Sequence, residues 1–95
     1  MPRLSVCMIT RNESADLARC LSSAKGLADE LVVVDTGSTD DTIAIARSFG
    51  AHVIEHAWRH DFAEARNVSL DAATGDWILS LHGRGHASRL LRRAS

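Results

Sequence analysis

The sequence predicts an α/β fold in which a parallel sheet lies between two layers of helices. Short apolar runs alternate with amphipathic stretches throughout residues 1–81, and turn-forming residues separate them. The run Leu31–Val34 is apolar without alternation, which is typical of a strand buried on both faces, as in a parallel sheet. The connections are short, so parallel strands here require helical crossovers, which are right-handed. The predicted order is β-α-β-α-β-α-β, a three-layer arrangement.

Each element of this order has its own signal. The predicted strands are Leu4–Ile9, Leu31–Val34, Ala51–Glu55 and Trp77–Leu81. The predicted helices begin near residues 12–14, 40 and 61. Each is followed by a residue that commonly caps a helix, and these residues are Gly26, Gly50 and Gly75. Apolar residues recur at spacings of three and four on one face of the first helix, at Leu17, Cys20, Leu21 and Ala24.

The composition is that of a single globular domain. The chain has 95 residues, of which 45% are hydrophobic and 24% charged, and this balance argues against general disorder. No stretch approaches the ~20 apolar residues of a transmembrane helix, and the N-terminal apolar run is too short for a signal peptide. Cys7 and Cys20 fall in apolar patterns, as small buried residues of a reduced compartment do. We therefore expect a cytoplasmic protein without disulfides.

The charge of the chain changes abruptly at His82. All twelve acidic residues precede it, whereas four arginines follow it without an Asp or a Glu. We expect residues 1–81 to form the folded domain and residues 82–95 to form a basic, disordered tail. A basic tail on an acidic body can also contact nucleic acid or an acidic lipid surface. The arginines available for such a contact are Arg84, Arg89, Arg92 and Arg93.

The polar residues with the clearest functional pattern follow the second predicted strand. Asp35 is the first polar residue after four apolar ones, so it should lie at the carboxyl end of the sheet, where open α/β sheets bind ligands. A carboxylate there can accept hydrogen bonds from a base or a ribose. Gly37 permits a tight turn or a close approach of the backbone, and Ser38 or Thr39 can cap the next helix. The same residues are equally consistent with a turn that only starts a helix.

Histidine and arginine give weaker signals. The histidines spaced by four are His52, His56 and His60, and then His82 and His86. The first three would align on a helix, but His52 lies in a predicted strand, and the last two lie in the predicted tail. We therefore predict no histidine metal site. Arg66 lies in the middle of a predicted helix, and its position fits either a solvated residue or one that faces a phosphate or a base.

Three stretches together resemble the N-terminal part of family 2 glycosyltransferases. They are LSVCMITRNES, LVVVDTGSTDDT and HAWRHDFAEARNVSLDAATGDWILSL, within about residues 3–81. Inside the family they resemble the subgroup similar to lipopolysaccharide-core and peptide glycosyltransferases. The resemblance implies a partial GT-A fold, the nucleotide-diphospho-sugar transferase fold, with this segment as its nucleotide-binding half. The partner that it implies is a nucleoside-diphosphate sugar, and it implies no nucleic-acid partner.

The resemblance also implies a set of nucleotide-binding residues. Thr10 matches the family residue that ends the first strand beside the base, and Glu13 matches the acidic residue after it. Asp35 matches the carboxylate that binds the base, and this chain has Thr36 where a second Asp often follows. Arg66 matches an element near the nucleotide. The residues expected to bind nucleotide are Thr10, Asn12, Glu13, Asp35, Gly37 and Arg66.

The family pattern stops at the end of the strand Trp77–Leu81. The family has an Asp-x-Asp motif there, which helps hold the ribose and binds Mn²⁺ or Mg²⁺, hard ions that need oxygen ligands. This chain has His82-Gly83-Arg84 instead, so we expect no metal or other cofactor and no catalytic residue in it. We interpret the chain as an inactive fragment, from a truncated gene or a shifted reading frame, of an enzyme that transfers a sugar to an acceptor.

Two other functions stay open. The chain could be a module that binds nucleotide without catalysis, or an interaction protein that uses its basic tail. Whichever function holds, the other half of the domain would normally follow the strand Trp77–Leu81, and without that half we expect one edge of this strand to be exposed. An exposed strand edge with apolar surface promotes association, so we expect self-association through this edge.

Overall fold

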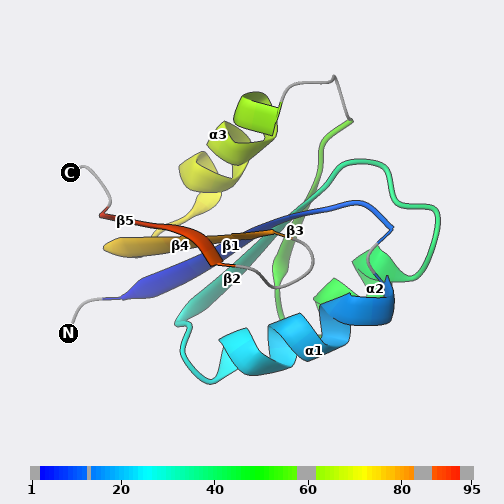
Figure 1. Ribbon diagram of the computed structural model, residues 1–95, viewed down its shortest axis with the longest axis horizontal. Coiled ribbons are helices and arrows are strands. Elements are labelled where there is room, and N and C mark those ends of the chain that lie inside the picture. The colour runs from blue at the N-terminus through cyan, green and yellow to red at the C-terminus, as the bar shows by residue number, and fades with distance from the viewer. Residues whose placement is uncertain (1–2, 13, 58–61, 83–86, 93–95) are drawn as a thin grey trace.

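The computed structural model describes residues 3–12, 14–57, 62–82 and 87–92. They form a five-stranded sheet with helices on both faces (Figure 1). In chain order the elements are β1 Leu4–Thr10, α1 Ser14–Lys25, β2 Glu30–Asp35, α2 Thr42–Ser48, β3 His52–Glu55, α3 Phe62–Ala72, β4 Trp77–His82 and β5 Ala87–Arg92. The predicted alternation of strands and helices is confirmed as far as β4.

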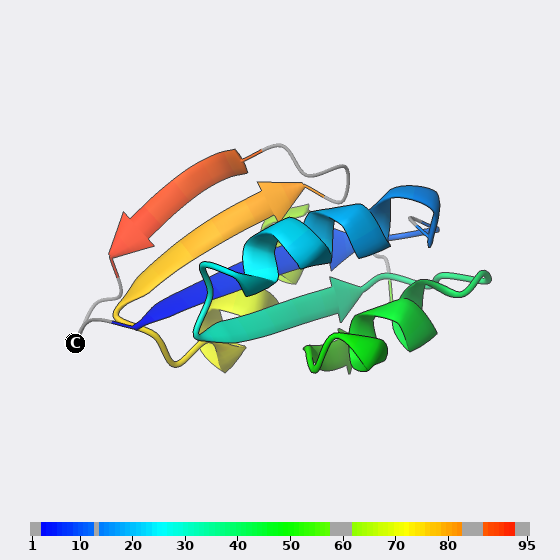
Figure 2. The ribbon, with the colours of Figure 1, turned by 90° about the horizontal axis from the view of Figure 1, so that it is seen from below.

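The strands are arranged in the order β3-β2-β1-β4-β5, and the first four are parallel. Figure 2 shows β5, β4, β1 and β2 side by side, with α1 and α2 in front of them. In the register of β1, Thr10 lies opposite Asp35 of β2, and Ile9 lies opposite His82 of β4. Because these strands are parallel, their carboxyl ends meet at one edge of the sheet.

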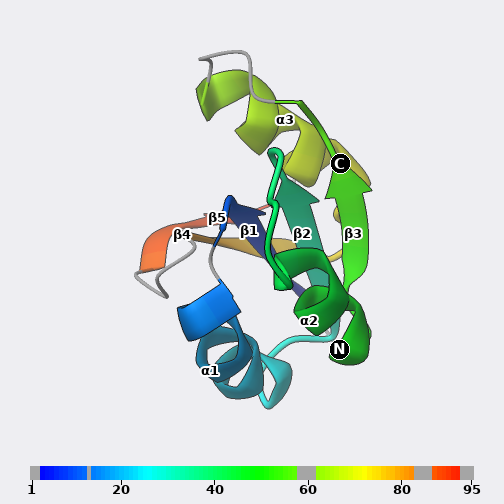
Figure 3. The same ribbon diagram turned by 90° about the vertical axis from the view of Figure 1, so that its right-hand side faces the viewer.

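The core lies on both faces of the central strands. Helices α1 and α2 cover one face and α3 covers the other (Figure 3). Successive side chains of a strand point to opposite faces. Accordingly, Val6 and Met8 of β1 pack in the cluster with α1 and α2, whereas Cys7 packs in the cluster that includes Ala73 and Ile78. The unbroken apolar run of β2 is explained in the same way, since Val32 and Val33 belong to different clusters.

The prediction of a disordered tail is wrong for residues 87–92. These residues form β5, which is antiparallel to β4, with Leu79 opposite Leu90 and Ser80 opposite Arg89. The basic composition did not indicate a strand. Strand pairing uses backbone N–H and C=O groups, which nearly every residue has, so a basic sequence can also pair. The strand Trp77–Leu81 is therefore not an edge strand, and in the described sheet the outermost strands are β3 and β5. The other tail residues, 83–86 and 93–95, lie outside the described residues.

Glu30, the first residue of β2, holds the amino end of the sheet together. Its Oε1 accepts hydrogen bonds from Ser5 Oγ and Thr74 N at 2.8 Å each, and its Oε2 accepts one from Thr74 Oγ1 at 2.8 Å. Ser5 Oγ in turn accepts a hydrogen bond from Gly75 N at 2.8 Å. Burial raises the pKa of Glu30, but the hydrogen bonds from Thr74 and Ser5 outweigh it, so the pKa is lowered overall. The network ties the loop before β4 to β1 and β2.

Both cysteines are buried, and neither is part of a disulfide. Burial raises the pKa of the Cys7 thiol to about 11, and the thiol donates a hydrogen bond to the Ser69 carbonyl at 3.6 Å. Cys7 is therefore an unreactive core residue, because the thiolate is the reactive form of cysteine. Among the described residues, no helix is long and apolar enough to cross a membrane.

Candidate functional site

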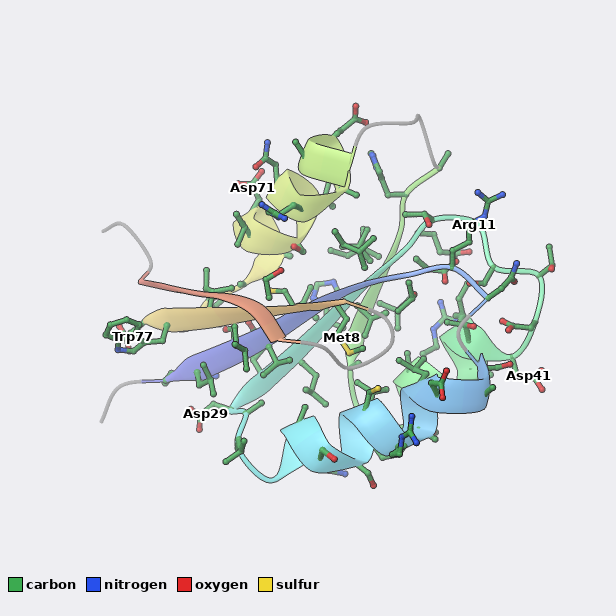
Figure 4. All side chains as sticks on the ribbon, viewed as in Figure 1. Met8, Arg11, Asp29, Asp41, Asp71 and Trp77 are labelled. Carbon is green, nitrogen blue, oxygen red and sulfur yellow. The ribbon has the colours of Figure 1, made fainter. Side chains whose placement is uncertain are left out.

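The carboxyl ends of β1 and β2 bring Thr10 and Asp35 side by side. The Thr10 hydroxyl donates a hydrogen bond to Asp35 Oδ1 at 3.1 Å. Thr36 extends the pairing past the strand, since its N–H and its hydroxyl donate to the Thr10 carbonyl at 2.9 and 3.0 Å. We call this edge, where residues 10–12 and 35–40 meet, the rim. In Figure 4, Arg11 and Asp41 lie at this end of the molecule, while Trp77 lies at the opposite end.

The carboxylate of Asp35 is the centre of the rim. Its side chain is buried, with the residue only 2% exposed. Oδ1 accepts hydrogen bonds from the hydroxyls of Thr10 and Ser38, at 3.1 and 2.5 Å. Oδ2 accepts hydrogen bonds from the backbone N–H groups of Gly37 and Ser38, at 3.1 and 2.8 Å. Asp35 therefore lies where the sequence predicts, and its carboxylate is surrounded by donors of the protein itself.

Gly37 gives the loop after β2 its shape. Its φ is 111°, in a region that residues with a Cβ rarely adopt. This turn brings the N–H groups of Gly37 and Ser38 to the same carboxylate oxygen. The sequence-based expectation of a tight turn at Gly37 is met, and the turn closes on Asp35.

Asn12 joins the loop after β1 to the loop after β2. Its backbone N–H donates to Ser38 Oγ at 2.8 Å, and its side-chain Oδ1 accepts a hydrogen bond from Thr39 N at 2.8 Å. Its φ of 52° is left-handed, a conformation that asparagine tolerates better than most residues. Asn12 is exposed. The next predicted residue, Glu13, lies outside the described residues.

Asp40 fixes the start of α2, a role that the sequence had suggested for Ser38 or Thr39. Its Oδ1 accepts hydrogen bonds from Thr42 N, at 3.0 Å, and from the Thr42 hydroxyl. Its Oδ2 accepts one from Ser14 N, at 3.3 Å, where α1 begins. The bond from the Thr42 side chain is the main reason that the pKa of Asp40 is lowered to about 2. Ser38 and Thr39 instead serve the contact between the two loops.

His56, the residue after β3, contacts both Asp35 and α3. The N–H of His56 donates to the Asp35 carbonyl at 2.8 Å, and His56 Nε2 lies 2.8 Å from Glu64 Oε1 of α3. Arg66 follows two residues later and is half-buried on the same helix. One hydrogen-bond network thus includes four of the predicted residues, Thr10, Asn12, Asp35 and Gly37. Arg66 lies on α3, which the His56–Glu64 contact joins to the residue after β3.

The sequence did not indicate the polar residues that bind the two loops together. These are Ser38, Thr39, Asp40 and Ser14, and they are ordinary turn and cap residues in the sequence. The motif GSTDD could have identified Ser38 as a partner of Asp35, and Thr39 as a partner of Asn12, only if the turn conformation were known. No three His, Cys, Asp or Glu side chains within the described ranges lie close enough to hold a metal ion.

Comparison with known proteins identifies relatives over nearly the whole chain. Residues 5–83 match the model of glycosyl transferase family 2. A TPR repeat-containing protein of Synechococcus elongatus is 53% identical over 81 residues, which is 85% of this chain and 20% of that protein. An uncharacterized glycosyltransferase of Rickettsia felis is 38% identical over 92 residues, which is 97% of this chain and 32% of that protein. The second alignment extends past β4 into β5.

A solved structure agrees with these relatives. Glucosyl-3-phosphoglycerate synthase from Mycobacterium tuberculosis, in complex with Mn²⁺, uridine diphosphate and glucosyl-3-phosphoglycerate, superposes with a TM-score of 0.73 and 33% sequence identity. The match covers 86% of this chain and 33% of that one. The chain thus spans about a third or less of the length of these relatives. Its fold is a partial GT-A glycosyltransferase fold, and the chain belongs to glycosyl transferase family 2.

Proposed function

We propose that this chain binds a nucleoside-diphosphate sugar at the rim, as part of a transferase that passes the sugar to an acceptor. The observation that carries the proposal is the joining of the loops after β1 and β2 into one polar surface, through Asp35 and Asn12. This surface lies at the carboxyl edge of the sheet, where ligands bind in open α/β folds. The similar synthase has also been solved with Mn²⁺, UDP-glucose and phosphoglyceric acid, which supports a nucleotide sugar as the ligand class.

The nucleotide contacts that we propose come from exposed or partly exposed groups of the rim and of α3. Asn12 and Gly37 are exposed, and Arg66 is half-buried. Arg66 would pair with a phosphate, since a guanidinium binds phosphate through two parallel hydrogen bonds. Thr10 and Asp35 form the floor beneath the loops. Glu13 is included on the family resemblance alone.

The end of β4 does not fit a hard divalent cation. His82 lies opposite Ile9 at the carboxyl end of β4, beside the rim, and the sequence continues with Gly83 and Arg84. Mn²⁺ and Mg²⁺ select carboxylate and carbonyl oxygen ligands, whereas these side chains offer an imidazole and a guanidinium. We therefore propose nucleotide binding without a metal, and no sugar transfer by these 95 residues. This donor set favours the second candidate function, a nucleotide-binding module without catalysis.

Calorimetry with UDP, CDP, GDP and ADP tests the proposal, with and without Mn²⁺. We compare the natural chain with the triple variant His82→Asp, Gly83→Ala and Arg84→Asp. The natural chain should bind at least one of the four nucleotides equally well with and without Mn²⁺. Mn²⁺ should strengthen binding only in the triple variant. The proposal fails if the natural chain binds none of the nucleotides, and the metal-free form of it fails if Mn²⁺ tightens binding or if a nucleotide sugar is turned over.

The remaining features of the proposal concern partners and location. We propose that copies of the chain associate through the outermost strands β3 and β5, and not through β4. We propose no nucleic-acid partner for this chain. We also propose a cytoplasmic location, which is supported by two cysteines that form no disulfide.

A further inference from the structure

We infer that Asp35 is a positioning residue, which binds the loop of residues 36–39 and not the nucleotide. The inference rests on the proposed function, because it concerns how the rim is prepared for a nucleotide. A carboxylate offers about four positions for hydrogen-bond donors. In Asp35 four donors of the protein occupy them, two on each oxygen. A nucleotide N–H or hydroxyl would have to displace one of these donors.

Burial supports the same role. Asp35 is 2% exposed, whereas Gly37, Thr39 and Asn12 around it are exposed. The surface that a ligand meets at the rim is therefore formed by the loops. The carboxylate lies beneath that surface and determines its shape.

The hydrogen bonds show how Asp35 acts on the surface above it. Ser38 Oγ donates to the Asp35 carboxylate and accepts a hydrogen bond from Asn12 N, at 2.8 Å. Asn12 Oδ1 then accepts a hydrogen bond from Thr39 N, at 2.8 Å. Asp35 thus orients Ser38, Ser38 holds the backbone of Asn12, and Asn12 holds the far side of the loop. Removing the carboxylate should loosen the contact between the two loops at Ser38.

Asparagine at this position separates positioning from direct contact. Oδ2 of Asp35 receives two backbone N–H groups, which can only donate, whereas Oδ1 receives two hydroxyls, which can also accept. An asparagine oxygen can therefore take the place of Oδ2, and its NH₂ group can donate to the hydroxyls of Thr10 and Ser38. The loop keeps its shape in Asp35→Asn, although the negative charge is lost. Alanine keeps neither the bonds nor the charge.

The experiment measures the affinity for UDP, CDP, GDP and ADP by calorimetry in the parent, Asp35→Asn and Asp35→Ala. In parallel it measures hydrogen exchange of the Gly37 and Ser38 amides. We expect Asp35→Asn to bind within about threefold of the parent and Asp35→Ala to bind about ten- to a hundredfold more weakly. The two amides should stay protected in Asp35→Asn and exchange rapidly in Asp35→Ala.

Glu30→Ala is the matched control, because it removes the carboxylate at the other end of β2. That carboxylate accepts three hydrogen bonds, and the Asp35 carboxylate accepts four. It should lower the melting temperature without changing the nucleotide affinity at a temperature where all variants are folded. The inference is overturned if Asp35→Asn loses as much affinity as Asp35→Ala while its amides stay protected, since the carboxylate would then touch the ligand. If the parent binds no nucleotide, the proposed function fails, and unprotected amides in Asp35→Asn would then overturn the positioning role independently.

Discussion

At the scale of single residues, Gly75 is a sharp test of how closely the loop before β4 packs on β1. A Cβ at this position would lie 2.6 Å from Ser5 Oγ, 2.8 Å from Ser5 N and 2.9 Å from the Arg3 carbonyl. Two of these atoms belong to the backbone and cannot turn away. We expect Gly75→Ala to destabilise the fold by about 1–3 kcal/mol, the usual cost of overpacking.

Chemical denaturation of the parent and Gly75→Ala measures this difference in the free energy of unfolding. Gly26→Ala is the control, because a Cβ at Gly26 would meet no atom within 4 Å. Equal destabilisation by the two substitutions would show that the loss of glycine, and not the contact with β1, is responsible.

Single residues also show how far the sequence can predict the candidate site. The place of Asp35 was predictable, because a polar residue after a buried strand must lie at the strand's end. Its four hydrogen bonds were not, because they depend on the left-handed turn at Gly37 and on the loop after β1 coming close. The family resemblance indicated Asn12 as a site residue, but its hydrogen bonds to the loop after β2 could be found only from the fold.

At the scale of elements, Asp40 makes the start of α2 sensitive to acid. Folding lowers its pKa from 3.8 to about 2, chiefly through the hydrogen bond from Thr42. A lowered carboxyl pKa stabilises the folded state fully above the ordinary pKa, and that contribution is lost as the pH falls toward the folded-state value. We expect Asp40→Asn to flatten the dependence of unfolding free energy on pH between about 4 and 2.

Urea denaturation at several pH values gives this dependence. Asp41→Asn is the matched control, since Asp41 is the adjacent carboxylate at the helix N-terminus and makes no side-chain capping bond. The loss of pH dependence should be confined to Asp40→Asn. An equal loss in both variants would assign the effect to charge near α2 and not to the capping bonds.

The elements themselves were predictable to different degrees. Strands β1, β2 and β4 are apolar runs that both clusters of the core require, so the sequence pattern identifies them. The start of α2 was predicted about two residues early, because Asp40 caps the helix from outside it. β5 was missed, because its sequence ASRLLR has only Leu90 and Leu91 as large apolar residues and lies in a basic stretch.

At the scale of the whole molecule, β5 protects the edge of β4. Removal of residues 83–95 would leave the N–H and C=O groups of β4 unpaired along one side, and such edges recruit other strands. At the same concentration, we expect the shortened chain to form larger assemblies than the parent. Sedimentation velocity measures this, and removal of residues 93–95 alone, which leaves β5 in place, is the control. A shortened chain with the same mass distribution as the parent would contradict the protective role.

The two carboxylates of β2 have a consequence for how this domain can change by mutation. Glu30 begins the strand and Asp35 ends it, and at about 3.3 Å per residue the two networks lie roughly 17 Å apart. Changes that far apart, with no shared partner, usually add in their effects. A substitution that changes the rim and lowers the free energy of unfolding can therefore be offset by a stabilising substitution at the amino end, around Ser5 and Thr74. β2 therefore separates the rim, which can change toward new ligands, from the Glu30 network, which keeps the chain folded.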